Sequence, residues 1–126
     1  MPTGAQDATV YKICSSEDWD HAVATGTYDG SPDDRRDGFI HLSTSCQLEG
    51  TLARHFAGRD RLLLIALPTG WLGPALRWEP SRGGQLFPHL YGTLPVTAAQ
   101  RTWPLELDAS GQHVLPALSA SGARGT

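Results

Sequence analysis

The sequence has two cysteines, one lysine and no long apolar run, and each shortage narrows what the chain can be. Cys14 and Cys46 form neither a Cys-x-x-Cys pair nor a Cys/His cluster with the spacing of a structural zinc site. We therefore expect no metal and at most one disulfide. Residues 1–10 lack the basic and apolar regions of a signal peptide, and no apolar run approaches the roughly 20 residues of a membrane span. These absences favour a cytoplasmic protein without a membrane partner.

Basic residues are too few and too dispersed for a general nucleic-acid binder. Ten Lys and Arg residues stand against 13 Asp and Glu residues, which gives a formal net charge of −3. A nucleic-acid-binding face carries a basic stripe or patch instead. We expect a small-molecule ligand, no general nucleic-acid binding, and a monomer or a homodimer.

The length and apolar content fit one domain. The chain has 126 residues, 40% of them hydrophobic, which is enough for one modest core. We predict a flexible, polar N-terminal tail over residues 1–9 and a single globular domain over residues 10–108. Residues 109–126 are mostly Ser, Ala, Gly and Pro, and we predict a disordered tail there.

Capping signals and apolar periodicity predict an α+β fold. Ser15 is an N-cap for a helix that ends at Gly26, and Thr44-x-x-Gln47 is a capping-box pattern for a second helix that runs to about residue 56. The six apolar residues 62–67 predict a central strand buried on both faces. Further short strands are expected over residues 10–14, 39–42, 76–79, 90–91, 94–96 and 98–107. Together these elements predict a compact, two-sheet, mostly antiparallel core with two helices in the N-terminal half.

His41 is the first candidate for chemistry. It lies in a short strand that is followed by hydroxyl residues, among them Ser43 and Thr44, and then by a helix N-terminus. Free backbone N–H groups at such a strand end favour an anion, and a neutral imidazole beside them can donate to a ligand or act as a base. In the alternative interpretation, His41 is a hydrogen-bonded core residue and the hydroxyls only cap the helix.

The segment 78–84 is the second candidate. Glu79 leaves a strand beside Trp78, and Ser81 and Arg82 follow in a loop whose glycines allow a ligand to approach closely. An acid, a hydroxyl and a guanidinium so near one another could bind a polar small molecule. The alternative is a Glu79–Arg82 surface ion pair, worth at most about 1 kcal/mol, next to a glycine turn.

His89 and Tyr91 form the third candidate, since alternating residues of an extended segment share one face. Two polar tips on rigid rings could orient a ligand. Alternatively, Tyr91 packs with its hydroxyl exposed and His89 caps a turn.

The segment 28–38 contains two glycines, one proline and four aspartates, and we expect it to be a loop. Asp29, Asp33, Asp34 and Asp37 could together hold a hard cation, but no EF-hand spacing is present and two arginines lie among them. We favour a solvated loop, in which Asp37 makes the turn into the next strand.

The sequence gives weaker evidence of a chemical role for the remaining histidines and for Cys46. We expect His21, His55 and His113 to be incidental. Cys46 lies close to His41 in sequence, so a Cys–His nucleophile is conceivable, but no third residue is visible to orient the pair. We expect a small buried thiol at this position.

These residues together resemble a known family, the domain-of-unknown-function family 952, over about residues 10–107. The resemblance rests on the segments Val10-Tyr11-Lys12-Ile13, Asp37-Gly38-Phe39-Ile40-His41-Leu42-Ser43-Thr44, Trp78-Glu79-x-Ser81-Arg82-Gly83-Gly84 and Phe87-Pro88-His89-Leu90-Tyr91-Gly92. Family members are mostly small bacterial proteins, and their fold looks like a divergent, minimal version of the ADP-ribosyltransferase fold.

What the resemblance implies is a cleft for NAD between two small sheets. His41 would contact the ribose, Ser43 the carboxamide, and Tyr91 would stack on the nicotinamide. The sequence departs from that superfamily in one respect, because its Glu79 precedes Tyr91 whereas the usual order is His, Tyr, Glu. The RNA 2′-phosphotransferases, which also lack this Glu, suggest Arg82, His41 and His89 as an alternative set.

Three functions fit these residues. The first is an NAD-linked or nucleotide-linked transferase or hydrolase, with NAD as substrate and with His41, Glu79 and His89 as catalytic residues. Ser43, Thr44, Ser81, Arg82 and Tyr91 would then bind the ligand. The second is an acid–base enzyme that acts on a non-nucleotide small molecule, for example in secondary metabolism. The third is a non-catalytic module that binds a small ligand.

Overall fold

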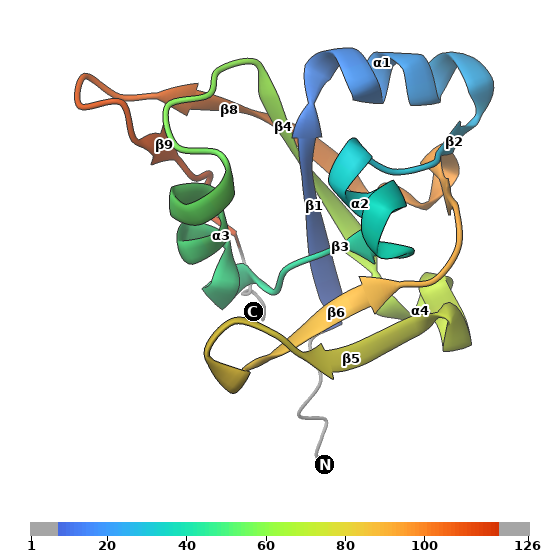
Figure 1. The fold of residues 1–126 in the computed structure, drawn as a ribbon. Coiled ribbons are helices and arrows are strands. Elements are labelled where there is room, and N and C mark those ends of the chain that lie inside the picture. The colour runs from blue at the N-terminus through green and yellow to red at the C-terminus, as the bar shows by residue number, and fades with distance from the viewer. Residues whose placement is uncertain (1–7, 119–126) are drawn as a thin grey trace.

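The computed structural model describes residues 8–118 and has an α+β fold with antiparallel sheets, as the sequence predicts (Figure 1). The helices are α1 (Ser16–Thr25), α2 (Pro32–Asp37), α3 (Leu48–His55) and α4 (Thr69–Leu72). The strands are β1 (Thr9–Ser15), β2 (Thr27–Tyr28), β3 (Ile40–His41), β4 (Leu62–Pro68), β5 (Leu76–Pro80), β6 (Leu86–Leu90), β7 (Leu94–Pro95), β8 (Arg101–Leu107) and β9 (His113–Val114). They form three sheets, of orders β1-β4-β8-β9, β3-β6-β5 and β2-β7.

Strands β1 and β4 of the four-stranded sheet are buried on both faces, because their alternate residues point into two separate clusters of apolar side chains. Val10 and Cys14 of β1 pack with α1, whereas Tyr11 and Ile13 pack with α3. In β4, Leu64 and Ile65 point to opposite clusters and are both fully buried. The prediction of a central strand buried on both faces is confirmed.

A short backbone bridge joins this sheet to the three-stranded sheet. Tyr11 N donates to Ser43 O at 2.8 Å, and Ser43 N donates back to Tyr11 O at 2.9 Å. Ser43 lies two residues after the end of β3, so the edge strand β1 is tied to the chain just beyond β3. The residues of β1 and of β3 therefore lie close together, although about 30 residues separate them in sequence.

Helices α1 and α3 begin where the capping signals predict. Ser15 Oγ accepts from Asp18 N at 3.0 Å, and α1 ends at Gly26, whose φ of 100° is left-handed. A single 3₁₀ turn over Ser45–Gln47 precedes α3. Trp19 and Ala22 face the core from α1, whereas Val23, the next apolar residue, is 56% exposed.

Helix α2 corrects the prediction of a loop over residues 28–38. Ser31 is its N-cap, Pro32 follows at the first helical position, and Gly38 ends the helix at a φ of 86°. These three signals are present in the sequence. They were insufficient because a six-residue helix of Pro, Asp and Arg has no apolar stripe, which is the main sequence signal for a helix.

The C-terminal segment is more structured than the sequence indicates. Strand β9 pairs with β8 in the register Glu106↔Val114 and Leu107↔His113, and Leu115 packs against the apolar cluster of α3. The predicted boundary at residue 108 therefore falls inside a hairpin. Residues 1–7 of the predicted N-terminal tail and residues 119–126 of the predicted C-terminal tail lie outside the described residues.

Both thiols are free. Cys14 is buried and Cys46 is exposed, so the expectation of a buried thiol at position 46 is wrong. Burial raises the pKa of the Cys14 thiol to about 12. None of the helices in the described part of the chain is long and apolar enough to cross a membrane.

One buried hydroxyl yields a test of the packing. The Tyr28 ring packs 6.1 Å from the Trp19 ring, and among residues 8–118 the structure gives its hydroxyl no hydrogen-bond partner. Since an unsatisfied buried polar group costs about 1–3 kcal/mol, Tyr28→Phe should raise the free energy of unfolding by about 1 kcal/mol in urea denaturation. A loss of stability instead would mean that the hydroxyl bonds a buried water.

Candidate functional site

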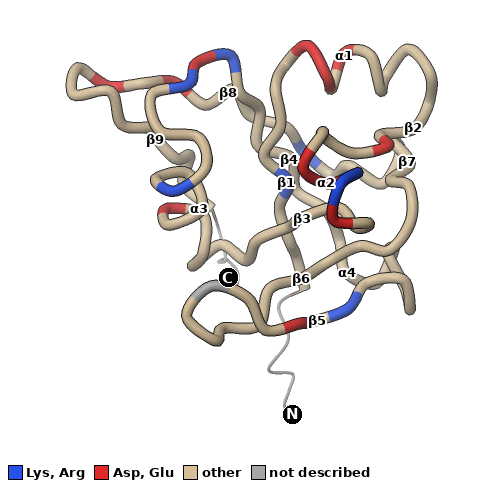
Figure 2. The backbone as a smooth tube through the Cα atoms, viewed as in Figure 1, with Lys and Arg blue, Asp and Glu red and all other residues tan. Residues whose placement is uncertain are grey.

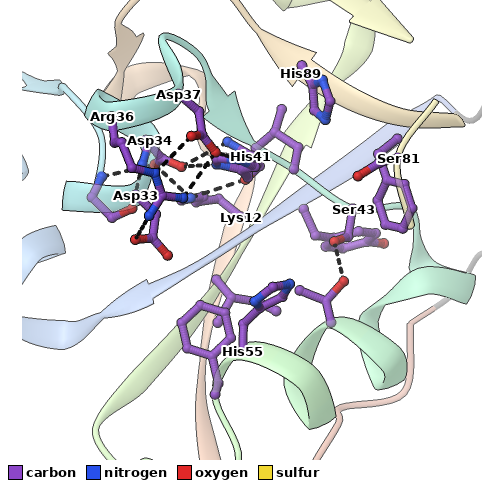
Figure 3. A pocket seen from close by; sticks show the side chains of 17 residues that line it. Lys12, Asp33, Asp34, Arg36, Asp37, His41, Ser43, His55, Ser81 and His89 are labelled. Carbon is purple, nitrogen blue, oxygen red and sulfur yellow. Dashed lines mark hydrogen bonds and ion pairs between the residues drawn. The ribbon is translucent and has the colours of Figure 1, made fainter. Parts of the chain in front are cut away.

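A pocket of about 280 Å³ lies between α2 and α3 (Figure 3). Residues of β1 and β3 form its floor, and β6 and the loop after β5 close one side. The polar and charged residues that line it are Tyr11, Lys12, Ser31, Asp33, Asp34, Arg36, Asp37, His41, Ser43, Thr51, His55, Ser81 and His89. Ile13, Leu42, Phe56 and Phe87 complete the lining, so polar and apolar side chains share its walls.

The buried carboxylate of Asp34 organises one wall of the pocket. Its Oδ2 accepts from Lys12 Nζ at 2.8 Å and from Ser31 N at 2.9 Å. Its Oδ1 accepts from the backbone N of His41 at 3.0 Å and is 2.6 Å from His41 Nδ1. Four donors surround a side chain that is only 2% exposed, so the charge is fully compensated inside the protein.

The local sequence explains how Asp34 reaches this position. Asp34 is the third residue of α2, and its carboxylate and the Ser31 hydroxyl cap each other's backbone N–H groups. Gly30 makes room for it: a Cβ on Gly30 would lie 2.8 Å from Asp34 Cβ, and the φ of 111° at Gly30 also favours glycine.

Lys12 supplies the balancing charge. It is 4% exposed, and besides Asp34 it donates to the backbone carbonyl of His41 at 3.1 Å. The three residues Lys12, Asp34 and His41 therefore link β1, α2 and β3. Although burial raises the pKa of Asp34, the His41 hydrogen bond and the Lys12 charge outweigh it and hold that pKa well below its ordinary value.

His41 lies between two carboxylates. Its Nδ1 faces Asp34 Oδ1, and its Nε2 is 2.9 Å from Asp37 Oδ2. A carboxylate only accepts, so both contacts are hydrogen bonds at once only when the imidazole is doubly protonated. The side chain of His41 therefore bridges two acceptors and is still 39% exposed toward the pocket.

His89 has a different environment. In the β3–β6 pair it lies directly opposite His41, and the two rings are 5.8 Å apart in an edge-to-face arrangement. Its Nδ1 is 2.8 Å from Glu79 Oε1, which also accepts from the Tyr91 hydroxyl at 2.8 Å. These two hydrogen bonds, first that of His89, lower the pKa of Glu79. An ionised Glu79 fixes the Nδ1–H tautomer of His89, which leaves Nε2 for a ligand.

Phe39 covers the two histidines. Its ring stacks on that of His89 at 4.0 Å with an interplanar angle of 22°, and it lies 4.7 Å from His41 and 5.2 Å from Tyr91. Rings packed this closely restrict the rotation of both imidazoles. The side chains of Phe39, His41 and His89 are therefore held in fixed positions before a ligand binds.

The structure brings some predicted residues into the pocket and leaves others outside. His41, His89, Ser43 and Ser81 line it, and Ser43 Oγ is 3.0 Å from Thr51 Oγ1. Glu79 does not line the pocket but contacts His89 from the side of β5. 

Three predicted ligand-binding residues have other environments. Tyr91 is 37% exposed, with Arg77 over its ring and Glu79 at its hydroxyl. Thr44 helps to begin α3, because its N–H donates to Gln47 Oε1 at 3.0 Å. The side chain of Arg82 lies outside the described part of the structure, and only its backbone is placed, in a 3₁₀ turn over Arg82–Gly84.

Four pocket residues were missed or misjudged from the sequence. Asp34 and Asp37 are hydrogen-bonded to His41, which corrects the expectation of a solvated acidic loop. Lys12, the one lysine of the chain, is a charged residue within a strand of mostly apolar residues. This charge was the feature of the sequence that could have marked Lys12 as a site residue. His55, which we expected to have no role in a site, lines the pocket from the end of α3.

Charges near the pocket are paired within the protein. Figure 2 shows acidic and basic positions side by side on α2, where Arg36 contacts Asp33 at 3.2 Å and Asp37 at 2.9 Å. Within residues 8–118, no group of three or more His, Cys, Asp or Glu residues is arranged to hold a metal ion.

This arrangement is suited to proton transfer. One histidine lies between two carboxylates, and the other has a carboxylate at Nδ1 and a ring nitrogen left for substrate. Of two adjacent imidazoles, one can donate a proton as general acid while the other accepts one as general base.

Comparison with known proteins gives the following similarities. The model of the family described as "Protein of unknown function (DUF952)" matches residues 13–102. The crystal structure of protein CC0527 from Caulobacter crescentus is similar with a TM-score of 0.81 and 46% identity, over 84% of this chain and 93% of that one. Its solution NMR structure gives a TM-score of 0.77 and 44% identity, over 93% and 98%. No curated protein matches the chain.

The Asp34 carboxylate should contribute a large part of the free energy of unfolding of the domain. Asp34→Asn removes the charge that Lys12 and His41 share, and breaking a buried ion pair on one side costs about 3–5 kcal/mol. Urea unfolding should show a loss in this range. Asp33→Asn is the matched control on the same helix, and because Asp33 is exposed, its cost should be within about 0.5 kcal/mol. Equal small losses in both variants would contradict the central role of Asp34.

The pH dependence of stability follows from the lowered pKa of Asp34. The folded protein keeps Asp34 ionised at pH values where the unfolded chain takes up a proton, so stability is full above about pH 4 and decreases as the pH falls toward the folded pKa. Urea unfolding in the Asp33→Asn control should show this decrease, and Asp34→Asn should show a shallower one. Parallel curves for the two variants would contradict the assignment.

Proposed function

The chain belongs to the DUF952 family of proteins of unknown function, and from this premise we propose that it is an acid–base transferase or hydrolase that acts on a nucleotide-linked substrate, with NAD as the first candidate. The observation that carries the proposal is the pair of adjacent imidazoles, each hydrogen-bonded through Nδ1 to its own carboxylate, at the edge of one pocket.

In the proposed reaction His89 is the general base and His41 the general acid or charge donor. Nε2 of His89 takes the proton from an attacking hydroxyl or water, whose oxygen forms the new bond to the substrate. The bond to the leaving group breaks and the leaving group takes the electron pair. The N–H of His41 stabilises a leaving group that departs as an oxyanion, whereas the nicotinamide of NAD departs neutral and needs no such donor. Glu79 acts as a positioning residue, because it contacts His89 rather than the pocket.

The nucleotide part of the proposal is supported by the resemblance to ADP-ribosyltransferases and by the shape of the site. The pocket lies where the three-stranded and four-stranded sheets meet, with hydroxyls and aromatic rings on its walls. Ser43 and Ser81 are placed to donate or accept hydrogen bonds from a sugar or an amide. Tyr91 would reach such a ligand only at the rim, since its hydroxyl is bonded to Glu79.

A second candidate is an acid–base enzyme for a smaller, non-nucleotide molecule. The pocket volume of about 280 Å³ favours it, because that volume is at the lower end of ligand sites and holds only part of a dinucleotide. The catalytic residues would be the same in both cases. A binding module without turnover is the remaining alternative.

Ligand-dependent thermal unfolding with NAD and a panel of nucleotides tests the proposal first. Binding at about 100 times the Kd adds about 2.7 kcal/mol to the free energy of unfolding, so NAD should raise the melting temperature of the wild-type protein. His41→Ala should abolish that rise. His21→Ala, an exposed change on α1, should leave it unaltered.

Turnover is tested with the same variants and the ligand that binds. Loss of a general base typically lowers the rate by about 10²–10⁴-fold, so His89→Ala should lose activity to that extent and Glu79→Gln less. The same dependence on a non-nucleotide substrate would favour the second candidate. Binding without product in the wild-type protein would refute an enzymatic function.

A further inference from the structure

The contact between Asp37 and His41 occupies the part of the site that a substrate has to reach. Asp37 Oδ2 lies 2.9 Å from His41 Nε2, the ring nitrogen that is not in contact with Asp34. Both side chains are accessible, at 32% for Asp37 and 39% for His41. In Figure 3, Asp37 reaches His41 from the end of α2, beside the pocket.

The surroundings of this carboxylate are those of an anion site. Arg36 Nε donates to Asp37 Oδ1 at 2.9 Å and Arg36 Nη2 to Oδ2 at 3.3 Å, while His41 Nε2 lies 2.9 Å from Oδ2. The guanidinium thus binds both oxygens of one carboxylate, the bidentate pattern by which proteins bind carboxylates and phosphates, and an imidazole faces one of these oxygens. Asp37 is the last residue of α2, next to the left-handed Gly38.

The two carboxylates at His41 are not equivalent. Asp34 is buried and bound by four donors. Its displacement would leave the buried ammonium group of Lys12 without a counter-charge. Asp37 has only exposed or half-exposed partners, and the hydrogen bonds of an exposed carboxylate exchange readily with water. An incoming oxyanion can replace Asp37 at His41 Nε2, since it provides the same acceptor and charge.

From these contacts we propose that Asp37 is an internal stand-in for the anionic group of the substrate. The ligand's phosphate or carboxylate oxygen takes the place of Asp37 Oδ2 at His41 Nε2 and is held also by Arg36. The displaced Asp37 turns toward solvent. This role of Asp37 rests on the proposed function, because it requires the pocket to be the substrate site. The substrate class is then a molecule with an oxyanion group.

The test compares two aspartates of α2. Asp33 and Asp37 both line the pocket and both contact Arg36, but only Asp37 contacts His41. Asp33→Ala and Asp37→Ala therefore remove the same charge from the same helix, and only the second frees His41 Nε2. The probe is inorganic phosphate, titrated at constant ionic strength and followed by calorimetry and by NMR of the His41 ring. Acetate serves as a second probe.

Asp37→Ala should bind phosphate about tenfold tighter than the wild-type protein, because it loses a competing carboxylate next to the cation. Asp33→Ala should change the affinity at most about twofold, since an exposed charge is screened. The gain should vanish in Asp37→Ala/His41→Ala. Tighter binding of phosphate than of acetate would assign a phosphoryl group to the substrate, and the reverse order would assign a carboxylate.

Equal affinities in the two single variants, or a gain that persists without His41, would overturn the proposal, as would no phosphate binding to folded Asp37→Ala. Asp37→Ser empties the same position and replaces Asp37→Ala if that variant does not fold. Phosphate binding is measured without turnover. A failure of the anion site is therefore distinguishable from a failure of the proposed catalysis, which depends on His89.

Discussion

The buried ion pair between Lys12 and Asp34 is the interaction on which the site depends. An ionised carboxylate that is 2% exposed is tolerable only because every lone-pair direction meets a donor. The same carboxylate positions the backbone and the ring of His41. Three segments that are distant in sequence, β1, α2 and β3, are thereby fixed relative to one another, and the short helix α2 has a defined place despite its lack of an apolar face.

The two histidines depend on two different sheets. His41 is held by contacts from β1 and α2, and the Tyr11–Ser43 bridge ties the chain just beyond β3 to β1. His89 is held by the β5–β6 hairpin, through Glu79. The β3–β6 pairing places the two imidazoles opposite each other, and the Phe39 ring packs against both of them. A β3 of only two residues suffices because its neighbours fix it on both sides.

Sequence reasoning predicted the elements that have their own local signals. The caps of α1 and α3 and the apolar run of β4 were sufficient to place them, and the mostly antiparallel α+β class followed. The pairing of Glu79 with His89 was not predictable, because it requires the register of β5 against β6. Nor was the burial of Asp34, whose partner Lys12 is 22 residues away. Both depend on tertiary contacts that no short sequence window contains.

The burial of Lys12 has a practical consequence for measuring the dynamics of this domain. The chain has a single side-chain ammonium group, and in the folded protein that group is 4% exposed and bonded to Asp34. An amine-selective reagent can modify it only when β1 or α2 opens. The rate of acylation of Lys12, measured by mass spectrometry, would therefore report how often β1 or α2 opens locally in an otherwise native molecule.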